Sequence, residues 1–172
     1  MQEKKIHVAL LFGGNSSEHD VSKRSAHNIY DAMDKTKYDV SLFMFTKDGI
    51  LLGHQASQRI FNGEDEDQVV ADEYPKIDMS NPLAPIMALG EIQDVDIFYP
   101  VIQGNLGEDG TVQGLFKLLK KPYIGSGMLA SAASFDKAMT KRILNQGGVR
   151  TTTYLLVTPA NNDELTWAKI TA

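Results

Sequence analysis

Apolar positions along the chain form short continuous runs, and two of these are each followed by a glycine-rich break and a segment with helical spacing. The first run covers residues 6–12, where only His7 is polar, and is typical of a strand buried on both faces of a parallel sheet. We expect His7 to be partly exposed or to have a hydrogen-bonding partner. The following segment, 18–33, places these residues on one helical face: Val21, Ser25, Ile29, Tyr30 and Met33. We therefore predict a strand, a loop and a helix, with Ser16 and Ser17 as candidate caps.

A second unit of the same kind lies between residues 94 and 120. Residues 94–102 predict a strand and residues 115–120 a helix; between them, Gly104–Gly114 contains four glycines and the adjacent acids Glu108 and Asp109. Glycine suits backbone that takes positive φ or closely approaches a ligand. Parallel α/β sheets build sites in such loops, at the carboxyl ends of their strands. For a single loop of this kind, the alternative is a tight turn without a ligand. Because residues 13–18 form another such loop, a binding site is favoured.

Between these units the pattern predicts a hairpin and then a less regular region. Residues 38–45 read as a strand, 46–49 as a turn, and 50–52 as a short returning strand. Residues 53–85 lack a clear period, so we expect the acidic run 64–67 to be solvated surface and His54, which has no evident partner, to lie at the surface as well.

Past residue 120 the pattern predicts a short strand, a long helix and a further strand. The strand covers residues 122–125, and the helix covers 128–146 with Gly147 and Gly148 ending it. The β-branched segment 151–157 predicts another strand, and residues 164–170 look like the opening of another helix. Because so apolar a strand needs partners that the remaining residues cannot supply, we expect the native protein to continue past Ala172.

Composition narrows the class of protein. The 172 residues are 42% apolar and 23% charged, which is ordinary for a soluble globular protein, and the net charge of −5 gives no basic field for nucleic acid. The absence of cysteine excludes disulfides and thiolate metal sites. Neither a membrane-spanning run nor a signal-peptide core is evident, so we expect a cytoplasmic protein without membrane partners.

Two charged positions have both an ordinary and a functional interpretation. Glu18 lies at a predicted helix start, where a carboxylate is common because it favours the helix dipole; the alternative is that it binds a cationic substrate group in a cleft. Lys137 and Lys141 lie one helical turn apart, and such lysines on an exposed helix usually bind nothing specific. The glycines of the first loop do not form the spaced fingerprint of NAD sites.

Four motifs agree in order and spacing with one known family: Leu11–Ser22, Gly104–Gly114, Tyr123–Gly127 and Ser134–Lys137. Together they resemble the N-terminal part of the D-alanine–D-alanine ligases, members of the ATP-grasp superfamily. The resemblance implies an α/β fold: a Rossmann-like (pre-ATP-grasp) three-layer domain with a mostly parallel sheet over residues 1–124, and the beginning of an ATP-grasp central domain over 125–172.

The same resemblance implies a reaction and its residues. ATP would phosphorylate the carboxylate of one D-alanine, and the amine of a second would attack the acyl phosphate to give D-alanyl-D-alanine for peptidoglycan. Glu18, the implied catalytic residue, would bind the first ammonium, and Val21 would line the same pocket. Gln103 and Gly104 would complete this substrate site, and Lys137 would contact the phosphates of ATP. A homodimer is implied by the family alone.

Two departures from the family pattern bear on activity. Where this chain has Gln103, the family normally has a histidine that helps to hold the first substrate's carboxylate, and glutamine can donate hydrogen bonds but cannot carry positive charge. We expect altered first-substrate binding, although a harmless substitution is the alternative. The family's Mg²⁺ ligands and second-substrate pocket lie beyond the equivalent of Ala172, so this chain has no predicted metal ligands and should be inactive on its own.

Two other hypotheses stay open at this point. The chain could be a non-catalytic D-amino-acid-binding or dimerisation module derived from such a ligase. It could also be an unrelated nucleotide-binding α/β domain, which the missing glycine fingerprint disfavours. Within the ligase hypothesis, the sequence leaves open whether the second substrate is D-alanine, D-lactate or D-serine.

Overall fold

A computed structural model describes residues 4–78, 80–92 and 94–159 of the chain. The chain divides into two compact units, Met1–Ala132 and Ala133–Ala172. The predicted domain boundary after Ile124 stays a prediction.

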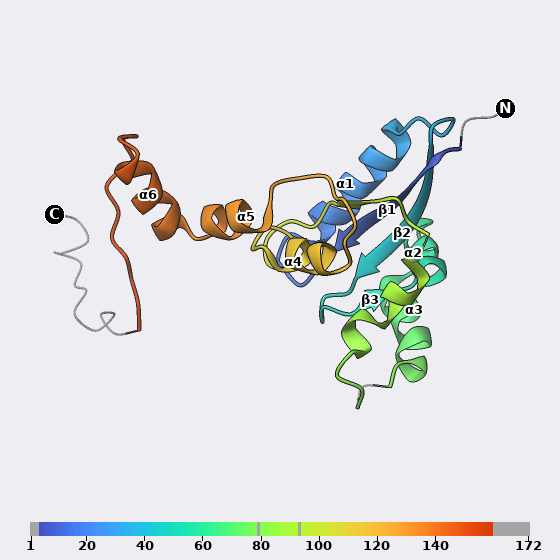
Figure 1. Cartoon of the computed structure of the whole chain (residues 1–172). Coiled ribbons are helices and arrows are strands. Elements are labelled where there is room, and N and C mark those ends of the chain that lie inside the picture. Colours follow the sequence, from blue (N-terminus) through green and yellow to red (C-terminus); the bar gives the residue numbers. More distant parts are fainter. Residues whose placement is uncertain (1–3, 79, 93, 160–172) are drawn as a thin grey trace. The chain divides into compact units, whose positions relative to one another are not determined.

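The first unit is built on a four-stranded sheet in the order β3-β2-β1-β4 (Figure 1). The strands are β1 (Ile6–Gly13), β2 (Tyr38–Phe45), β3 (Leu51–Leu52) and β4 (Ile97–Pro100). β1 pairs in parallel with both β2 and β4, with Val8 opposite Val40 on one side and Ile97 on the other. β3 returns antiparallel to β2, so the predicted hairpin is confirmed. The carboxyl ends of β1 and β4 therefore lie side by side.

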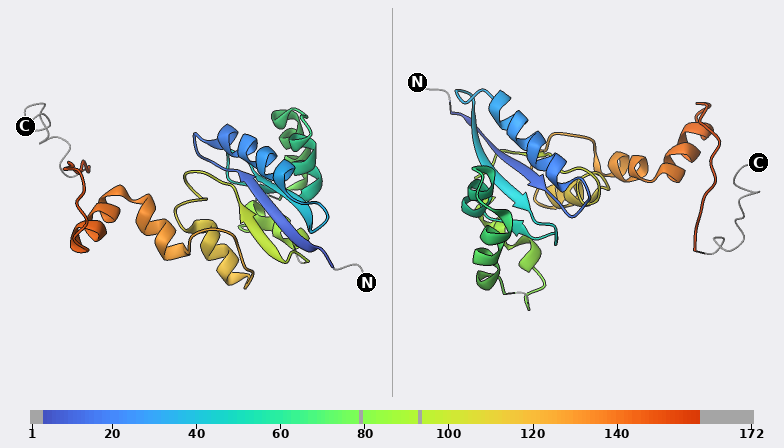
Figure 2. Two further views of the ribbon diagram at one scale, coloured as in Figure 1. Left: turned by 90° about the horizontal axis from the view of Figure 1, so that it is seen from above. Right: turned by 180° about the vertical axis from the view of Figure 1, so that it is seen from behind.

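Helices cover both faces of this sheet. Those of the first unit are α1 (His19–Ala32), α2 (His54–Phe61), α3 (Glu66–Glu73), η1 (Tyr74–Lys76), η2 (Ala84–Ile92) and α4 (Thr111–Leu118). Alternate residues of a strand face opposite sides. Accordingly, Leu10 and Phe12 pack with residues of α1, α2 and α3, whereas Ala9 and Leu11 pack with residues of η2 and α4. Figure 2 shows the same division (α1, α2 and α3 on one side), which confirms the predicted mixed α/β, mostly parallel architecture.

The region 53–85 is more regular than the sequence indicated. It contains α2 and α3, joined by a turn in which Asp65 caps α3 by accepting a hydrogen bond from the Gln68 amide at 2.9 Å. His54 begins α2 and is half-buried, with Nδ1 3.0 Å from the Leu42 amide nitrogen, so its predicted surface position was wrong. The apolar period was weak here because small side chains, including Ala56 and Ser57, are buried in place of large ones.

The predicted long helix 128–146 is two helices, α5 (Met128–Phe135) and α6 (Lys137–Gln146). Asp136 separates them: its backbone is extended, and its carboxylate accepts a hydrogen bond from the Met139 amide at 2.9 Å as an N-cap. Gly147 ends α6, as predicted. Residues 151–157 form no strand; no described strand lies alongside them, and β-branched residues alone do not make a strand. The predicted helix at 164–170 lies outside the described residues.

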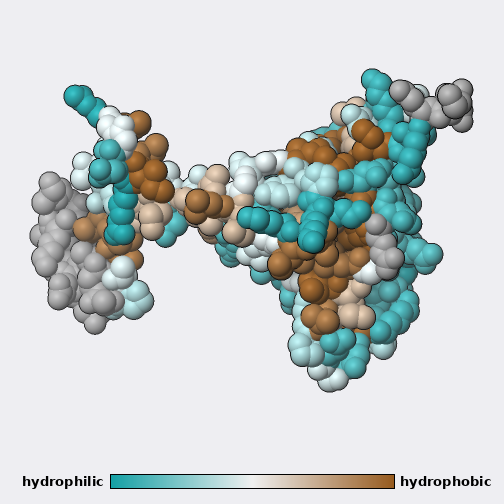
Figure 3. All heavy atoms as spheres, viewed as in Figure 1, coloured by the Kyte–Doolittle hydropathy of each residue, from teal (hydrophilic) through white to brown (hydrophobic). Residues whose placement is uncertain are grey.

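No helix in the described part of the chain is long and apolar enough to span a membrane. Apolar side chains do gather on part of the surface (Figure 3). In the first unit, the exposed ones include Leu83 and Met87, which are 58% and 57% exposed, beside and within η2.

Candidate functional site

Two loops meet where β1 and β4 end. The loop after β1 carries the Ser16 hydroxyl, which donates a hydrogen bond to the backbone carbonyl of Gln103 in the loop after β4, at 2.8 Å. Deeper in the unit, the buried Ser22 hydroxyl accepts from the Gly13 amide at 2.8 Å and donates to the Val101 carbonyl at 2.5 Å. The parallel sheet brings together segments that are 79 to 87 residues apart in the chain, and two serine hydroxyls join them.

Close backbone approach explains the glycines in these loops. Gly104 has a φ of +74°, and a Cβ at this position would lie 2.8 Å from Ser16 Cβ and 3.4 Å from Glu18 Oε2. At Gly107, a Cβ would lie 1.9 Å from the backbone carbonyl oxygen of Ile102, closer than any real contact. Gly104 leaves a space bordered by Ser16 and Glu18, whereas Gly107 allows the loop to fold back on the end of its own strand.

The acids of the second loop brace the loop itself. The Glu108 carboxylate accepts a hydrogen bond from the Gly104 amide at 2.9 Å. Asp109 accepts from the amides of Leu106 and Thr111, at 3.0 and 2.9 Å. Partial burial acts to raise the pKa of Asp109, but these hydrogen bonds outweigh it and hold the pKa below its usual value. Both carboxylates therefore fix the backbone of the loop.

Gln113 completes this bracing from α4. Its side chain is 5% exposed, and its Nε2 donates to the Gly107 carbonyl at 2.6 Å. Leu106, in the same loop, takes a φ of +73°, which is unusual for a residue with a branched side chain. The bracing holds the loop in a conformation that its sequence would not favour alone, as is common near binding sites.

Glu18 is exposed and occupies the N-cap position of α1. Its carboxylate lies beside Gly104, and its amide donates to the Ser16 hydroxyl at 3.1 Å. Ser16 thus contacts both loops, but it does not cap the helix through its side chain, so the predicted capping role of Ser16 and Ser17 was wrong. The structure brings Glu18 and Gly104 together, as a carboxylate site for a cation requires.

Val21 lies three residues further along α1 and is 38% exposed. The buried face of α1 is centred on His19, Ser22 and Ala26. Ile29 and Tyr30 of the predicted face pack against the same core, whereas Val21 lies outside it. The centre of the face was missed because two of its three buried residues are polar and are satisfied by hydrogen bonds. Val21 remains free to contact a ligand next to Glu18.

Gln103 is half-buried immediately before Gly104. Its side-chain oxygen is buried and has no hydrogen-bond partner among the described residues. A buried acceptor without a partner costs about 1–3 kcal/mol. The position that the family resemblance assigns to a substrate-binding histidine therefore holds an amide with unused hydrogen-bonding capacity.

Lys137 belongs to the second unit and is the first residue of α6. It is exposed, and its Nζ donates to the backbone carbonyl of Ser134 at 3.1 Å. Lys141, one turn on, donates instead to the backbone carbonyl and hydroxyl of Thr152, at 2.8 and 2.7 Å. Lys137 makes one hydrogen bond, to a neighbouring residue, whereas Lys141 makes two. Lys137 is therefore the better candidate for binding a phosphate.

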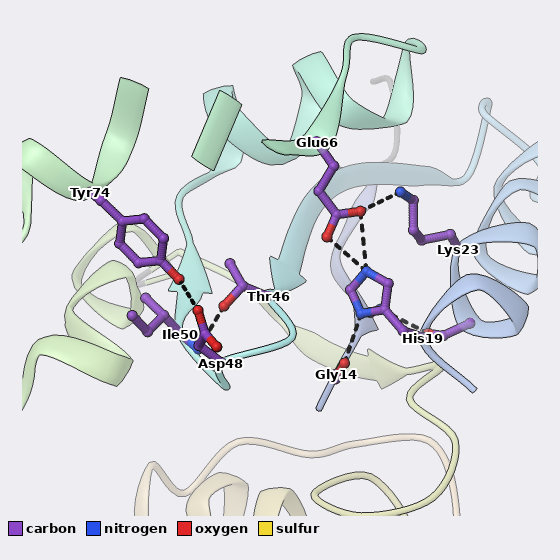
Figure 4. A network of polar contacts seen from close by, with 10 residues as sticks. Gly14, His19, Lys23, Thr46, Asp48, Ile50, Glu66 and Tyr74 are labelled. Carbon is purple, nitrogen blue, oxygen red and sulfur yellow. Dashed lines mark hydrogen bonds and ion pairs between the residues drawn. The ribbon is translucent and has the colours of Figure 1, made fainter. Parts of the chain in front are cut away.

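Sequence reasoning missed the role of two residues near the first loop. His19 is buried beside Gly14, and Glu66, assigned to a solvated acidic run, forms ion pairs with His19 and Lys23 at 2.9 and 2.5 Å (Figure 4). The solvated interpretation of Glu66 was wrong because its partners lie more than forty residues away in the chain. Its helical spacing from Val69 and Val70, which pack inward, was the available signal.

These features define an α/β domain with two glycine-containing loops side by side at the carboxyl ends of adjacent parallel strands. The family described as "D-ala D-ala ligase N-terminus" matches residues 7–126. The chain therefore belongs to the D-alanine–D-alanine ligase family and corresponds to its N-terminal part.

Individual relatives agree with this assignment. Over 170 residues the chain is 74% identical to the D-alanine–D-alanine ligase of Limosilactobacillus fermentum, covering 99% of this chain and 45% of the relative. Over 167 residues it is 70% identical to that of Limosilactobacillus reuteri, covering 97% and 44%. The solved D-alanine–D-alanine ligase of Coxiella burnetii superposes with a TM-score of 0.75 at 27% identity, covering 98% of this chain and 49% of that one. The chain thus spans a little under half the length of the curated relatives.

Proposed function

We propose that this chain is the N-terminal part of an ATP-dependent D-alanine–D-alanine ligase and that its two loops bind the first D-alanine. The observation that carries the proposal is the meeting of Glu18 with Gly104 at the carboxyl ends of β1 and β4. A carboxylate suits the ammonium of an amino acid, and loop amides suit its carboxylate and the oxyanion that forms when an amine attacks the acyl phosphate. Residues 1–124 would be the substrate domain, and 125–172 the start of the ATP-grasp central domain.

In this assignment Glu18 binds the ammonium of the first D-alanine and Val21 contacts its methyl group. Gln103 donates a hydrogen bond from its side-chain amide to the carboxylate, while Gly104 leaves room for the substrate. The exposure of Glu18 and Val21 supports their roles. Because the acyl phosphate must be kept from water, turnover also requires parts of the protein that close over the site.

ATP and Mg²⁺ enter the proposal through the family. Lys137 would contact the phosphates of ATP, consistent with its exposed position at the start of α6. The described residues contain no group of three or more His, Asp or Glu side chains that could hold a metal. On the family pattern, the Mg²⁺ ligands lie beyond the equivalent of Ala172, so residues 1–172 alone should release no phosphate.

A cytoplasmic homodimer is proposed on the same family basis. Leu83 and Met87, both exposed beside or within η2, offer apolar surface that a second subunit could cover. Sedimentation at increasing concentration tests this: alanine at both positions should weaken a dimer without reducing D-alanine binding.

A chimera tests the proposed reaction. Residues 1–172 replace the matched segment of the L. fermentum relative, and D-alanine-dependent phosphate release is measured alongside dipeptide formation. We expect turnover that requires D-alanine and ATP and is reduced at least about a hundredfold by Glu18→Gln, which removes the charge and keeps the shape. An equally active Glu18→Gln chimera would contradict the assigned site. The alternative, a non-catalytic module, predicts D-alanine binding but no turnover in the chimera.

A further inference from the structure

His19 contacts two separate parts of the fold from a buried position. It is the first residue of α1 and is 2% exposed. One ring nitrogen, Nδ1, lies 2.7 Å from the Gly14 carbonyl oxygen in the first loop. The other, Nε2, lies 2.9 and 3.2 Å from the two carboxylate oxygens of Glu66 on α3 (Figure 4). The ring therefore links α3 to the loop that carries Glu18.

The partners of this ring fix its orientation. The Gly14 carbonyl oxygen can only accept a hydrogen bond, so Nδ1 donates to it. Burial acts to raise the pKa of Glu66, but hydrogen bonds from Lys23 and His19 outweigh it and lower that pKa. Nε2 faces this carboxylate, which Lys23 also contacts.

The backbone of His19 holds the same loop at a second point. Its amide donates to the Ser16 carbonyl at 3.2 Å, and Ser16 in turn contacts Glu18 and Gln103 through its hydroxyl. The ring also packs on Gly13: a Cβ there would lie 3.3 Å from His19 Cε1. Movement of the His19 ring would therefore be transmitted through the Gly14 and Ser16 carbonyls to the position of Glu18.

We propose that His19 and Glu66 are positioning residues for the D-alanine site, holding the 13–18 loop so that the Glu18 carboxylate faces Gly104. The proposal rests on the proposed function, because it assumes that Glu18 binds the substrate. Neither residue touches the ligand. Glu66, on α3, orients the His19 ring, and the ring in turn orients the 13–18 loop. A carboxylate on α3 thereby sets the geometry of a site on the loop after β1.

Two substitutions at His19 separate its two contacts. In His19→Asn the side-chain amide lies near the position of Nδ1 and can still donate to Gly14, whereas in His19→Gln it reaches toward Glu66 and loses Gly14. NMR titration of residues 1–172 with D-alanine gives the dissociation constant of each variant. We expect His19→Gln to raise it by about tenfold or more, since small displacements of a positioned group have large effects, and His19→Asn to raise it by less than about threefold.

His54→Gln is the matched control. His54 likewise begins a helix, is half-buried, and contacts the backbone of Leu42, outside both loops. It should lower the melting temperature but leave the dissociation constant unchanged. If His19→Gln fails to fold, Glu66→Gln takes its place, because it keeps an acceptor for Nε2 but removes the charge; it should weaken D-alanine binding by about threefold or more.

The ¹⁵N signals of the His19 ring test the pair without substrate. We expect these signals to shift in Glu66→Gln, because the carboxylate that faces Nε2 is replaced by a neutral amide. The proposal is overturned if the wild type binds D-alanine and the Asn and Gln variants at position 19 bind it equally well, or if the ring signals are unchanged in Glu66→Gln. A different result would show that the proposed function is wrong. In that case the wild type itself would not bind D-alanine, whatever the ring signals show, and the positioning role would be wrong as well.

Discussion

Replacing Gly104 by alanine tests how closely the two loops approach. The substitution has two effects, and the structure separates them. First, a φ of +74° disfavours any residue with a Cβ by about 1–2 kcal/mol. Second, the new Cβ would lie 2.8 Å from Ser16 Cβ and 3.0 Å from Ser16 Oγ, so the first loop must shift, which typically costs a further 1–3 kcal/mol or so. We expect Gly104→Ala to lower the free energy of unfolding by about 2–5 kcal/mol.

Gly49→Ala serves as the control because it shares only the first effect. Gly49 has a φ of +79° in the turn of the β2–β3 hairpin, and a Cβ there would meet no atom within 4 Å. Urea denaturation of both variants therefore isolates the cost of the loop contact as the difference between them. Gly104→Ala should also weaken D-alanine binding by about tenfold or more, equivalent to about 1.4 kcal/mol, because the displaced Ser16 carries Glu18 with it. Gly49→Ala should bind D-alanine as the wild type does.

Equal destabilisation by the two variants would refute the argument, since the contact with Ser16 would then cost nothing. Unchanged D-alanine affinity in Gly104→Ala, despite the expected loss of stability, would refute the link between Ser16 and the site. A Gly104→Ala,Ser16→Gly double variant gives a further test: because glycine has no Cβ, it should be less destabilised relative to Ser16→Gly than Gly104→Ala is relative to the wild type.

Three further predictions concern residues around the same loops. Gly107→Ala should be more damaging than Gly104→Ala, because its Cβ would lie 1.9 Å from the Ile102 backbone oxygen; loss of a cooperative urea transition checks this, and wild-type stability would contradict it. Glu66→Gln should destabilise by about 1–3 kcal/mol at pH 7. The pKa of Glu66 is lower in the folded chain than in the unfolded chain, where it is about 4.3. Its ion pairs therefore stabilise the fold above about pH 4.3, and this stabilisation is lost as the pH falls through the folded-state pKa. The difference in unfolding free energy between Glu66→Gln and the wild type, measured with urea, should therefore shrink between pH 7 and pH 3, and a constant difference would contradict this. Gln103→His should change the affinity for the first D-alanine, measured by titration, and an unchanged affinity would show that the substitution is harmless.

The sequence predicted the sheet and the two loops because their signals are local. A continuous apolar run such as residues 6–12 marks a strand buried on both faces, and the glycines around residues 13 and 104 mark tight backbone, whatever the rest of the chain does. His7 also has the partners expected of it, Ser41 and the Asp94 carbonyl. These elements were sufficient to indicate a site at the carboxyl edge of a parallel sheet.

The features that could not be predicted from the sequence depend on residues far away in the chain. Glu66 looked like one of four solvated acids, and only the folded chain brings His19 and Lys23 to it. Ser22 replaces an apolar residue under α1 because the Gly13 amide and Val101 carbonyl satisfy its hydroxyl. The break at Asp136 was the exception, since an aspartate after Phe135 is a recognisable helix cap.

Titration of residues 1–172 with D-alanine, followed by the amide signals of the chain, tests the central claim most directly. The account predicts saturable shifts at Glu18, Val21, Gln103 and Gly104, weaker or absent shifts with L-alanine, and loss of saturation in Glu18→Gln. Shifts that avoid both loops, or that survive unchanged in Glu18→Gln, would contradict the proposal that these loops bind the first D-alanine.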